Sequence, residues 1–414
     1  MTSTPVLNVV VVGGGVGAVE TVLALHDLAA DRIDLTLVAR ERDFELRALS
    51  TAEPFAADHV RGHSLAELAA RVGARLIVDE VTGVDADRHA VRLGSGDALG
   101  YDALVLAVGA RQETAFRRAL TFTGQAHSTA YNGLLADLEE GWSHSIAFVV
   151  PPGVTWPLPL YELALMTAAD VRGMGIDGVA LELVTPEEAP LALFGPTASA
   201  GIAQLLAEAG ITFRGGVYAT AGPDHRLTVL PGGEALDAER VVALPTLAGP
   251  QLIGVPSDDR GFIPVDDACR VRDRPDVYAA GDGTTFPVKQ GGIACQMADA
   301  IAQQLARRAG AVVDPEPFRP VLRGRLLTPA GAQALEHPLT GGHGDGEAPV
   351  LRLWSPAHKV EGRYLSAWLQ EREEPTVAPV ADPQPGVPVD VPLLNDWQAG
   401  RLAMRLDPYT PTRS

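Results

Sequence analysis

The sequence predicts an α/β fold with two Rossmann-like, doubly wound domains and a smaller C-terminal region. Short apolar strands alternate with helices from residue 7 onward, and a second alternating series starts near residue 145. This alternation is typical of a parallel sheet with helices on both faces. A length of 414 residues also suits two or three domains, because a domain usually takes about 100–200 residues.

The first series opens with the β-branched run Leu7–Val12, which ends at a glycine and predicts a strand. A helix over 16–30 and a strand over 34–39 complete a β-α-β unit. Further along this half, the pattern predicts one more helix and three strands, at 66–72 and at 75–84, 90–93 and 101–108.

The second series opens with a strand over 146–150 and a helix over 160–172. Beyond it we expect strands at 179–184, 217–220, 227–230, 241–244 and 277–280, with helices at 198–208 and 291–308. After residue 314 the pattern weakens to strands at 321–327 and 350–354, a short helix at 364–370 and a Pro-rich extended linker or arm at 374–393.

Composition and charge exclude several classes of function. The chain carries 52 acidic against 33 basic residues, a formal charge of −19, which repels nucleic acid and anionic lipid. No run approaches the ~18 apolar residues of a transmembrane segment, and the start of the chain lacks a signal-peptide pattern, so we expect a cytoplasmic protein. The cysteines, Cys269 and Cys295, imply no disulfide framework. The scattered histidines predict no metal site.

A glycine-rich turn follows the first strand. Residues 13–18 read GGGVGA and fit the G-x-G-x-x-G/A pattern between a strand and a helix. Gly13 would allow the tight turn, Gly15 would let backbone N–H groups approach a pyrophosphate, and the small Ala18 would let helix and strand pack closely. The run therefore predicts dinucleotide binding, against the alternative of a purely structural turn.

The end of the second strand departs from this pattern, because an acidic residue usually binds a ribose hydroxyl there. Ala39 occupies that position and is followed by Arg40 and Glu41. Glu41 or backbone groups could substitute, Arg40 could bind a 2′-phosphate, or both charges could simply be solvated. Arg47, slightly further on, is a candidate partner for the pyrophosphate.

Two later motifs indicate a family. Residues 101–109 read YDALVLAVG and residues 277–282 read VYAAGD. Together with the glycine turn, and in this order, they resemble the FAD motifs of the pyridine nucleotide–disulfide oxidoreductase superfamily, over residues 5 to 325. Within it the chain looks most similar to the branch of sulfide:quinone oxidoreductases, flavocytochrome sulfide dehydrogenases and type II NADH dehydrogenases.

The resemblance implies that the protein binds FAD, with Asp282 on the ribityl chain of the flavin. It divides the chain into a first part of an FAD-binding domain (1–120), a degenerate NAD-binding-like domain (121–245), a second part of the FAD-binding domain (246–320) and a C-terminal region with a Pro-rich arm (321–414). The residues expected to bind the cofactor are Gly13, Gly15, Ala18, Arg40, Arg47, Val81, Ala107, Gly109, Gly281, Asp282, Lys289 and Gln290.

The departures from the family are informative. No cysteine precedes Cys269, which excludes a dithiol relay next to the first helix. The second Gly-rich turn is replaced by VPPGVTWPLP at 150–159, where four prolines remove backbone donors and Trp156 adds bulk, which argues against ordinary NAD(P)H binding. Trp156 also falls about where the branch carries a reactive cysteine, so its sulfide chemistry does not carry over.

Three residues are candidates for catalysis: Lys289, Glu162 and Tyr161. Lysine occurs only at 289 and 359, and Lys289 lies just after the second FAD motif, where an ammonium would stabilise the negative charge of reduced flavin; the alternative is chance placement on the surface. Glu162 could relay a proton or be a first-turn acid that the helix dipole favours. With Trp156, these three would line a pocket between the two dinucleotide-like domains.

The sequence thus predicts an FAD-dependent oxidoreductase that moves electrons between flavin and a small organic molecule or redox carrier, with quinones among the candidates. One alternative is an NAD(P)H-dependent flavin reductase, and another is a non-catalytic or redox-sensing flavoprotein scaffold. A homodimer is compatible with the sequence. Trp354, Tyr364 and Trp368 could contact a membrane surface, although such aromatic residues are more often core.

Overall fold

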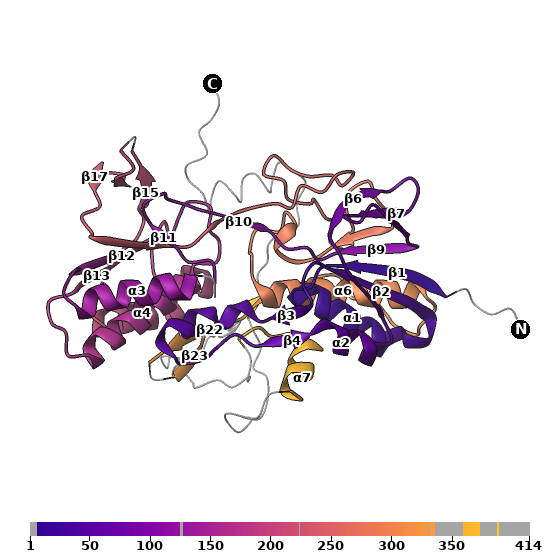
Figure 1. Ribbon diagram of the computed structural model, residues 1–414, viewed down its shortest axis with the longest axis horizontal. Coiled ribbons are helices and arrows are strands. Elements are labelled where there is room, and N and C mark those ends of the chain that lie inside the picture. The colour runs from indigo at the N-terminus through magenta and orange to yellow at the C-terminus, as the bar shows by residue number, and fades with distance from the viewer. Residues whose placement is uncertain are drawn as a thin grey trace, which may run out of the picture.

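The computed structural model describes residues 6–124, 127–222, 224–329, 331–335, 359–372 and 387–388. Two five-stranded sheets lie side by side along the long axis of the molecule (Figure 1). The first sheet takes its strands from residues 7–106 and from residues 277–279, whereas the second takes all of its strands from the stretch between them. The predicted α/β fold with two Rossmann-like units is confirmed.

The first sheet has the order β20-β9-β1-β2-β5, and all of its neighbouring strands are parallel. Side chains of β1 alternate between two cores. Val9 and Val11 join the large core under the helices, while Val10 and Val12 join a second core on the opposite face, as the period of two in a strand requires. The strands of this first sheet are β1 (Leu7–Val12), β2 (Ile33–Ala39), β5 (Arg75–Val78), β9 (Ala103–Leu106) and β20 (Val277–Ala279).

Helices cover one face of this sheet, and a small antiparallel sheet, β6-β7-β8, covers the other. The covering helices are α1 (Val16–Ala29), α2 (Leu65–Val72) and α6 (Gly291–Arg308). The small sheet consists of β6 (Val81–Asp85), β7 (Ala90–Leu93) and β8 (Ala98–Gly100). Burial on both faces explains why β1 and β9 are runs of apolar residues rather than alternating ones.

The second sheet has the order β11-β18-β12-β13-β14 and is also parallel. Its strands are β11 (Leu120–Thr121), β12 (Ser145–Val149), β13 (Ala180–Val184), β14 (Ile211–Arg214) and β18 (Arg240–Ala243). The helices of this unit are α3 (Ser128–Glu139), α4 (Leu158–Gly173) and α5 (Pro196–Glu208). The domain boundary predicted between residues 120 and 121 cuts β11, and the division into domains stays a prediction.

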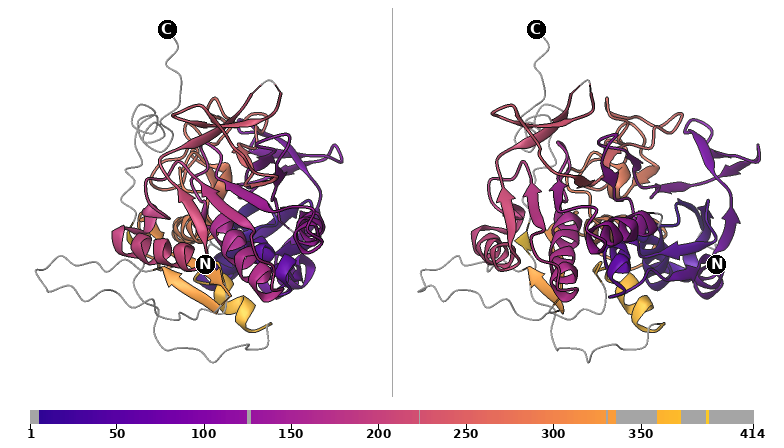
Figure 2. Two further views of the ribbon diagram at one scale, coloured as in Figure 1. Left: turned by 90° about the vertical axis from the view of Figure 1, so that its left-hand side faces the viewer. Right: turned by 60° about the vertical axis from the view of Figure 1, so that its left-hand side comes forward.

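Smaller elements connect and cover the two units. Figure 2 shows the β22–β23 hairpin and α7, drawn in orange to yellow, on the same side of the molecule. These elements are β3 (Asp43–Glu45), β4 (Gly62–Ser64), β10 (Arg111–Glu113), β15 (Tyr218–Ala221), β16 (Leu227–Leu230), β17 (Glu234–Ala235), β19 (Thr246–Ala248), β21 (Val321–Leu322), β22 (Gly324–Thr328), β23 (Gly331–Leu335), β24 (Val387–Pro388), α7 (Leu365–Gln370) and the 3₁₀ helices η1 (Ala30–Arg32), η2 (Arg47–Phe55), η4 (Ala192–Phe194) and η5 (Gly281–Gly283).

Several elements differ from the prediction. The single strand expected over 75–84 is wrong, because β5 and β6 belong to different sheets and the chain turns between them. Helix α3 was not predicted, since Asn132 and Gly133 interrupt its pattern with poor helix formers. The strand expected at 350–354 lies outside the described residues. So does the arm at 374–393, except for β24, which pairs with β21.

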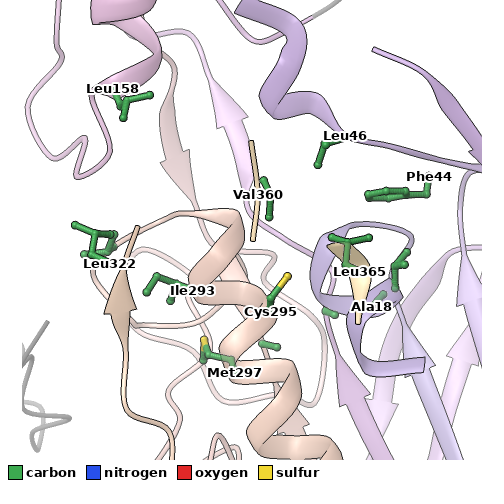
Figure 3. Packing of buried hydrophobic residues seen from close by; sticks show 14 of the residues in the cluster. Ala18, Phe44, Leu46, Leu158, Ile293, Cys295, Met297, Leu322, Val360 and Leu365 are labelled. Atoms are coloured by element: carbon green, nitrogen blue, oxygen red, sulfur yellow. The ribbon is translucent and has the colours of Figure 1, made fainter. Parts of the chain in front are cut away.

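The segment 359–372 packs across the first unit. Val360 lies against Gly291 at the start of α6 and Leu365 lies against α1, with Cys295 of α6 nearby (Figure 3). Trp368 is only 2% exposed, and its ring centroid lies 6.2 Å from Phe44, so this tryptophan is core. Among the described residues, no helix has the length and apolar character needed to cross a membrane.

A buried carboxyl holds this segment in place. Glu20 of α1 is fully buried and accepts a hydrogen bond from the Tyr364 backbone N–H at 3.0 Å and another from that of Leu365. Burial and the neighbouring Asp299 raise the pKa of Glu20 to about 8. The start of α7 is therefore fastened to α1 through the sequence-distant Glu20.

Candidate functional site

The glycine turn between β1 and α1 has the geometry of an anion site. Gly13 has φ +133°, and a Cβ there would lie 2.2 Å from the Ala107 carbonyl oxygen, so a side chain cannot be accommodated. No side chain caps α1 at Gly15, and a Cβ on Gly15 would meet no atom within 4 Å. An uncapped helix start beside open space can bind a phosphate. Ala18 is fully buried at the helix–sheet contact.

The other residues predicted around this turn are more dispersed. Arg40 and Arg47 are exposed, and the Arg47 guanidinium lies 3.6 Å from the Glu45 carboxylate. Val81 is 7% exposed in the second core. Gly109 has φ +69°, a backbone conformation that favours glycine. Direct contacts of these residues with a cofactor stay predictions.

The two later motifs meet in space. A Cβ on Gly283 would lie 2.8 Å from the Gly109 carbonyl oxygen, so the turn after β20 approaches the turn after β9. Asp282 lies in this turn, next to Gly281 at φ +79°. Burial raises the pKa of Asp282, and the positive charge of Lys289 partly offsets this. Within the described part of the chain, no residue forms a hydrogen bond with the Asp282 carboxylate, which leaves it available to a ligand hydroxyl.

Lys289 lies beside Asp282 in a well-defined environment. Its ammonium donates a hydrogen bond to the Thr284 carbonyl oxygen and lies 4.0 Å from the centroid of the Phe262 ring. Burial lowers the pKa of Lys289 to about 8, while Asp282 and Asp258 act in the opposite direction. The side chain is therefore mainly a cation at neutral pH. Sequence reasoning found Lys289 by the rarity of lysine, but no sequence signal identified Phe262.

Gln290 has a structural role in addition to the predicted one. Its Oε1 accepts a hydrogen bond of 2.8 Å from the Ile293 N–H, so it caps α6. Its Nε2 donates to the Arg323 carbonyl oxygen at 3.1 Å. Both ends of the side-chain amide are thus engaged within the protein. If Gln290 contacts the cofactor as predicted, this geometry favours a contact through its backbone.

Glu162 is the centre of a buried network. Its carboxylate is fully buried and pairs with the Lys359 ammonium, whose side chain is 6% exposed. Thr51 Oγ1 donates to Glu162 Oε2 at 2.8 Å, and the Leu327 N–H donates to Oε1 at 2.9 Å. Burial lowers the pKa of Lys359, and Glu162 partly offsets that effect. No sequence pattern pairs Lys359 with Glu162, although the rarity of lysine in this chain marks the residue.

Tyr161 lies in a different network at the carboxyl end of the second sheet. Its hydroxyl donates to Glu187 Oε2 at 2.7 Å, and burial raises the pKa of Glu187 to about 7. Trp156 packs edge-to-face on Phe194 at 5.7 Å, and Phe194 is fully buried. A dinucleotide would bind along this edge in an open α/β sheet, but these side chains already pack there.

The predicted site residues therefore form separate groups. Asp282 and Lys289 lie together near the glycine turns of the first unit. Glu162 and Tyr161 are fully buried and engaged with protein partners, so substrate contact by either stays a prediction. One bond joins the second unit to the Lys289 segment: Thr155 Oγ1 donates to the Pro287 carbonyl oxygen at 2.6 Å.

Two doubly wound units, an open helix start and an available aspartate at the turn after β20 define the class of two-domain dinucleotide-binding oxidoreductases. The chain belongs to the pyridine nucleotide-disulphide oxidoreductase family, whose model matches residues 7–149 and 162–303. It is a flavin-dependent oxidoreductase that binds FAD. The family match is interrupted over the Pro-rich loop that contains Trp156.

Relatives support this assignment. An NADH dehydrogenase-like protein of Mycobacterium tuberculosis is 30% identical over 296 residues, covering 66% of this chain and 72% of the relative. The sulfide-quinone reductase of Aquifex aeolicus is 28% identical over 178 residues, covering 41% of this chain and 40% of the relative.

Solved structures share the fold. The sulfide:quinone oxidoreductase of Aquifex aeolicus has a TM-score of 0.72 at 20% identity and covers 79% of this chain and 83% of its own. A ferredoxin reductase of Rhodopseudomonas palustris has a TM-score of 0.59 at 19% identity, with coverages of 79% and 81%.

Proposed function

We propose that this protein passes electrons between FAD and a small organic molecule or redox carrier, with a quinone as one candidate. The observation that carries the proposal is the ammonium of Lys289, which lies over the face of the Phe262 ring and interacts with the charge of Asp282. The printed names of relatives include a quinone reductase and a ferredoxin reductase, which are consistent with a carrier of this kind.

The chain's own residues suit this role. Bound FAD would supply the two-electron chemistry. The α1 N–H groups after Gly15 would bind the pyrophosphate, and the Asp282 carboxylate would accept a hydrogen bond from a ribityl hydroxyl. Lys289, with a pKa of about 8, would stay charged at pH 7 and favour the negative charge of the reduced state. A proton-relay role for Glu162 would require its carboxylate to leave Lys359.

We expect Lys289→Met to lower the reduction potential of the bound flavin. A cation in the site is worth on the order of 1–2 kcal/mol toward a charge gained there, or about 20–45 mV for a two-electron couple. Potentials of the FAD-loaded proteins, measured by equilibrium dye reduction at pH 6.5, give the comparison. Because the ammonium loses its proton above its pKa of about 8, the difference should shrink at pH 9.5.

Lys289→Arg is the matched control, since it keeps a positive charge at both pH values. It should retain most of the wild-type potential. Equal potentials for the wild type and Lys289→Met at pH 6.5 would contradict the role of Lys289.

An NAD(P)H-dependent flavin reductase is the second candidate, favoured by the 30% identity to an NADH dehydrogenase-like protein. Because Trp156 and Phe194 occupy the carboxyl edge of the second sheet, we expect the flavin to stay oxidised during anaerobic titration with NADH and NADPH. Rapid bleaching of the flavin absorbance would establish the reductase instead. Bound FAD that no reductant reduces would favour the redox-sensing scaffold. A cytoplasmic location, a homodimer and the lack of nucleic acid binding stay predictions.

A further inference from the structure

We propose that Phe262 is a positioning residue of the cofactor site, whose ring face holds the Lys289 ammonium against the Thr284 carbonyl oxygen in place of water. The ammonium lies 4.0 Å from the ring centroid and donates to Thr284. This inference rests on the role proposed for Lys289. It adds a residue that no sequence pattern singles out.

Phe262 is held firmly next to the turn that carries Asp282. Its ring is part of a side chain only 4% exposed, and its backbone N–H donates to Asp258 Oδ1 at 2.8 Å. The next residue, Ile263, donates to the Gly283 carbonyl oxygen at 2.8 Å and accepts from Thr285 at 2.9 Å. Two backbone hydrogen bonds of Ile263 therefore tie the chain next to the ring to the Asp282 turn.

The face of an aromatic ring suits a partly buried ammonium. It attracts a cation through the ring quadrupole but does not accept a proton, so it favours the charged form of Lys289. The other charged groups acting on Lys289 are Asp282 and Asp258, which favour the cation, and Arg260, which opposes it. Burial opposes the cation most strongly. The ring thus favours the protonated form of Lys289, whose pKa of about 8 lies close to neutral pH.

The test follows the protonation of Lys289 directly. The chain has only two lysines, Lys289 and Lys359, so FAD-loaded protein labelled with [13Cε]lysine gives two NMR signals. The signal missing from Lys289→Arg is that of Lys289. In Phe262→Leu, which keeps an apolar side chain but loses the ring, we expect the pKa of Lys289 to fall by about one pH unit. Phe262→Tyr, which keeps the ring face, should titrate like the wild type.

Phe286→Leu is the matched control. Phe286 is also buried and lies in the same chain segment as Lys289, but its ring packs edge-to-face on Phe318, with the ring centroids 5.4 Å apart. This variant should leave the titration of Lys289 unchanged. If Phe262→Leu does not fold, Phe262→Met replaces it, with the same expected fall. A wild-type pKa of Lys289 in a folded variant without the ring would overturn the inference.

The two proposals fail in different ways. If Lys289→Met leaves the flavin potential unchanged, the proposed function fails, while the NMR titration still decides whether Phe262 positions Lys289. If the potential shifts but Phe262→Leu titrates like the wild type, only the role of Phe262 is lost.

Discussion

Replacing Lys359 by methionine is expected to destabilise the protein by about 3–5 kcal/mol, because it removes the cation that is paired with the buried Glu162 carboxylate. Both side chains of this pair are almost completely buried. The hydrogen-bond donors from Thr51 and Leu327 satisfy the carboxylate oxygens but carry no charge, and the charge of Arg325, which also acts on Glu162, offsets only part of the loss. Methionine matches the length of the lysine stem, so lost packing is a minor part of the effect.

The free energy of unfolding in urea, measured for the FAD-loaded protein, gives this comparison. Glu162→Gln in the Lys359→Met background should recover most of the loss, because the buried charge is then removed. The exposed pair between Arg307 and Asp314 provides a matched control, and Arg307→Met should have little measurable effect. A loss below about 1 kcal/mol for Lys359→Met would contradict the structural importance of this pair.

Gly13→Ala is expected to lower the affinity for FAD by at least about 100-fold, the equivalent of about 3 kcal/mol. The added Cβ would lie 2.2 Å from the Ala107 carbonyl oxygen, and the backbone at φ +133° disfavours any side chain. The turn must therefore move, and the N–H groups at the start of α1 would move with it. Because those groups lie where the pyrophosphate would bind, cofactor affinity falls more than stability.

Flavin content after purification and titration of apoprotein with FAD measure this effect. Gly133→Ala, in α3, is the matched control, since a Cβ there meets nothing within 4 Å. It should bind FAD normally. Normal FAD affinity in Gly13→Ala would show that the turn is not the phosphate site.

The elements found correctly from the sequence are local. The strand–turn–helix from Leu7 to Ala29 is encoded in consecutive residues by its apolar period and its glycines, so the start of the first unit was predictable. Lys289 was singled out by the rarity of lysine and by its place next to a recognisable motif, and its role stays a prediction. The strand expected over 75–84 failed because an apolar pattern does not show where the chain leaves a sheet.

The residues that were missed are partners across long separations. Glu162 and Lys359 are 197 positions apart, and Thr51 and Glu162 are 111 apart. Phe262 reaches Lys289 only because backbone bonds align residues 262–263 with the Asp282 turn. No pattern within a short stretch of sequence encodes contacts between such distant residues. In each contact, therefore, one residue could be singled out from the sequence and its partner could not.

The split origin of the first sheet affects how the chain folds as it is made. The strands of the second sheet all lie between residues 120 and 243, so they can pair as soon as that stretch leaves the ribosome, although Glu162 of α4 gains Leu327 and Lys359 only later. Helix α1, in contrast, needs α6 and the segment 359–372 to cover it. At about 5–20 residues per second, that wait lasts roughly 20–70 seconds. The amino-terminal unit is therefore the first to begin and is completed only when the segment 359–372 is made, and during this interval its apolar surface is open to chaperones and to aggregation.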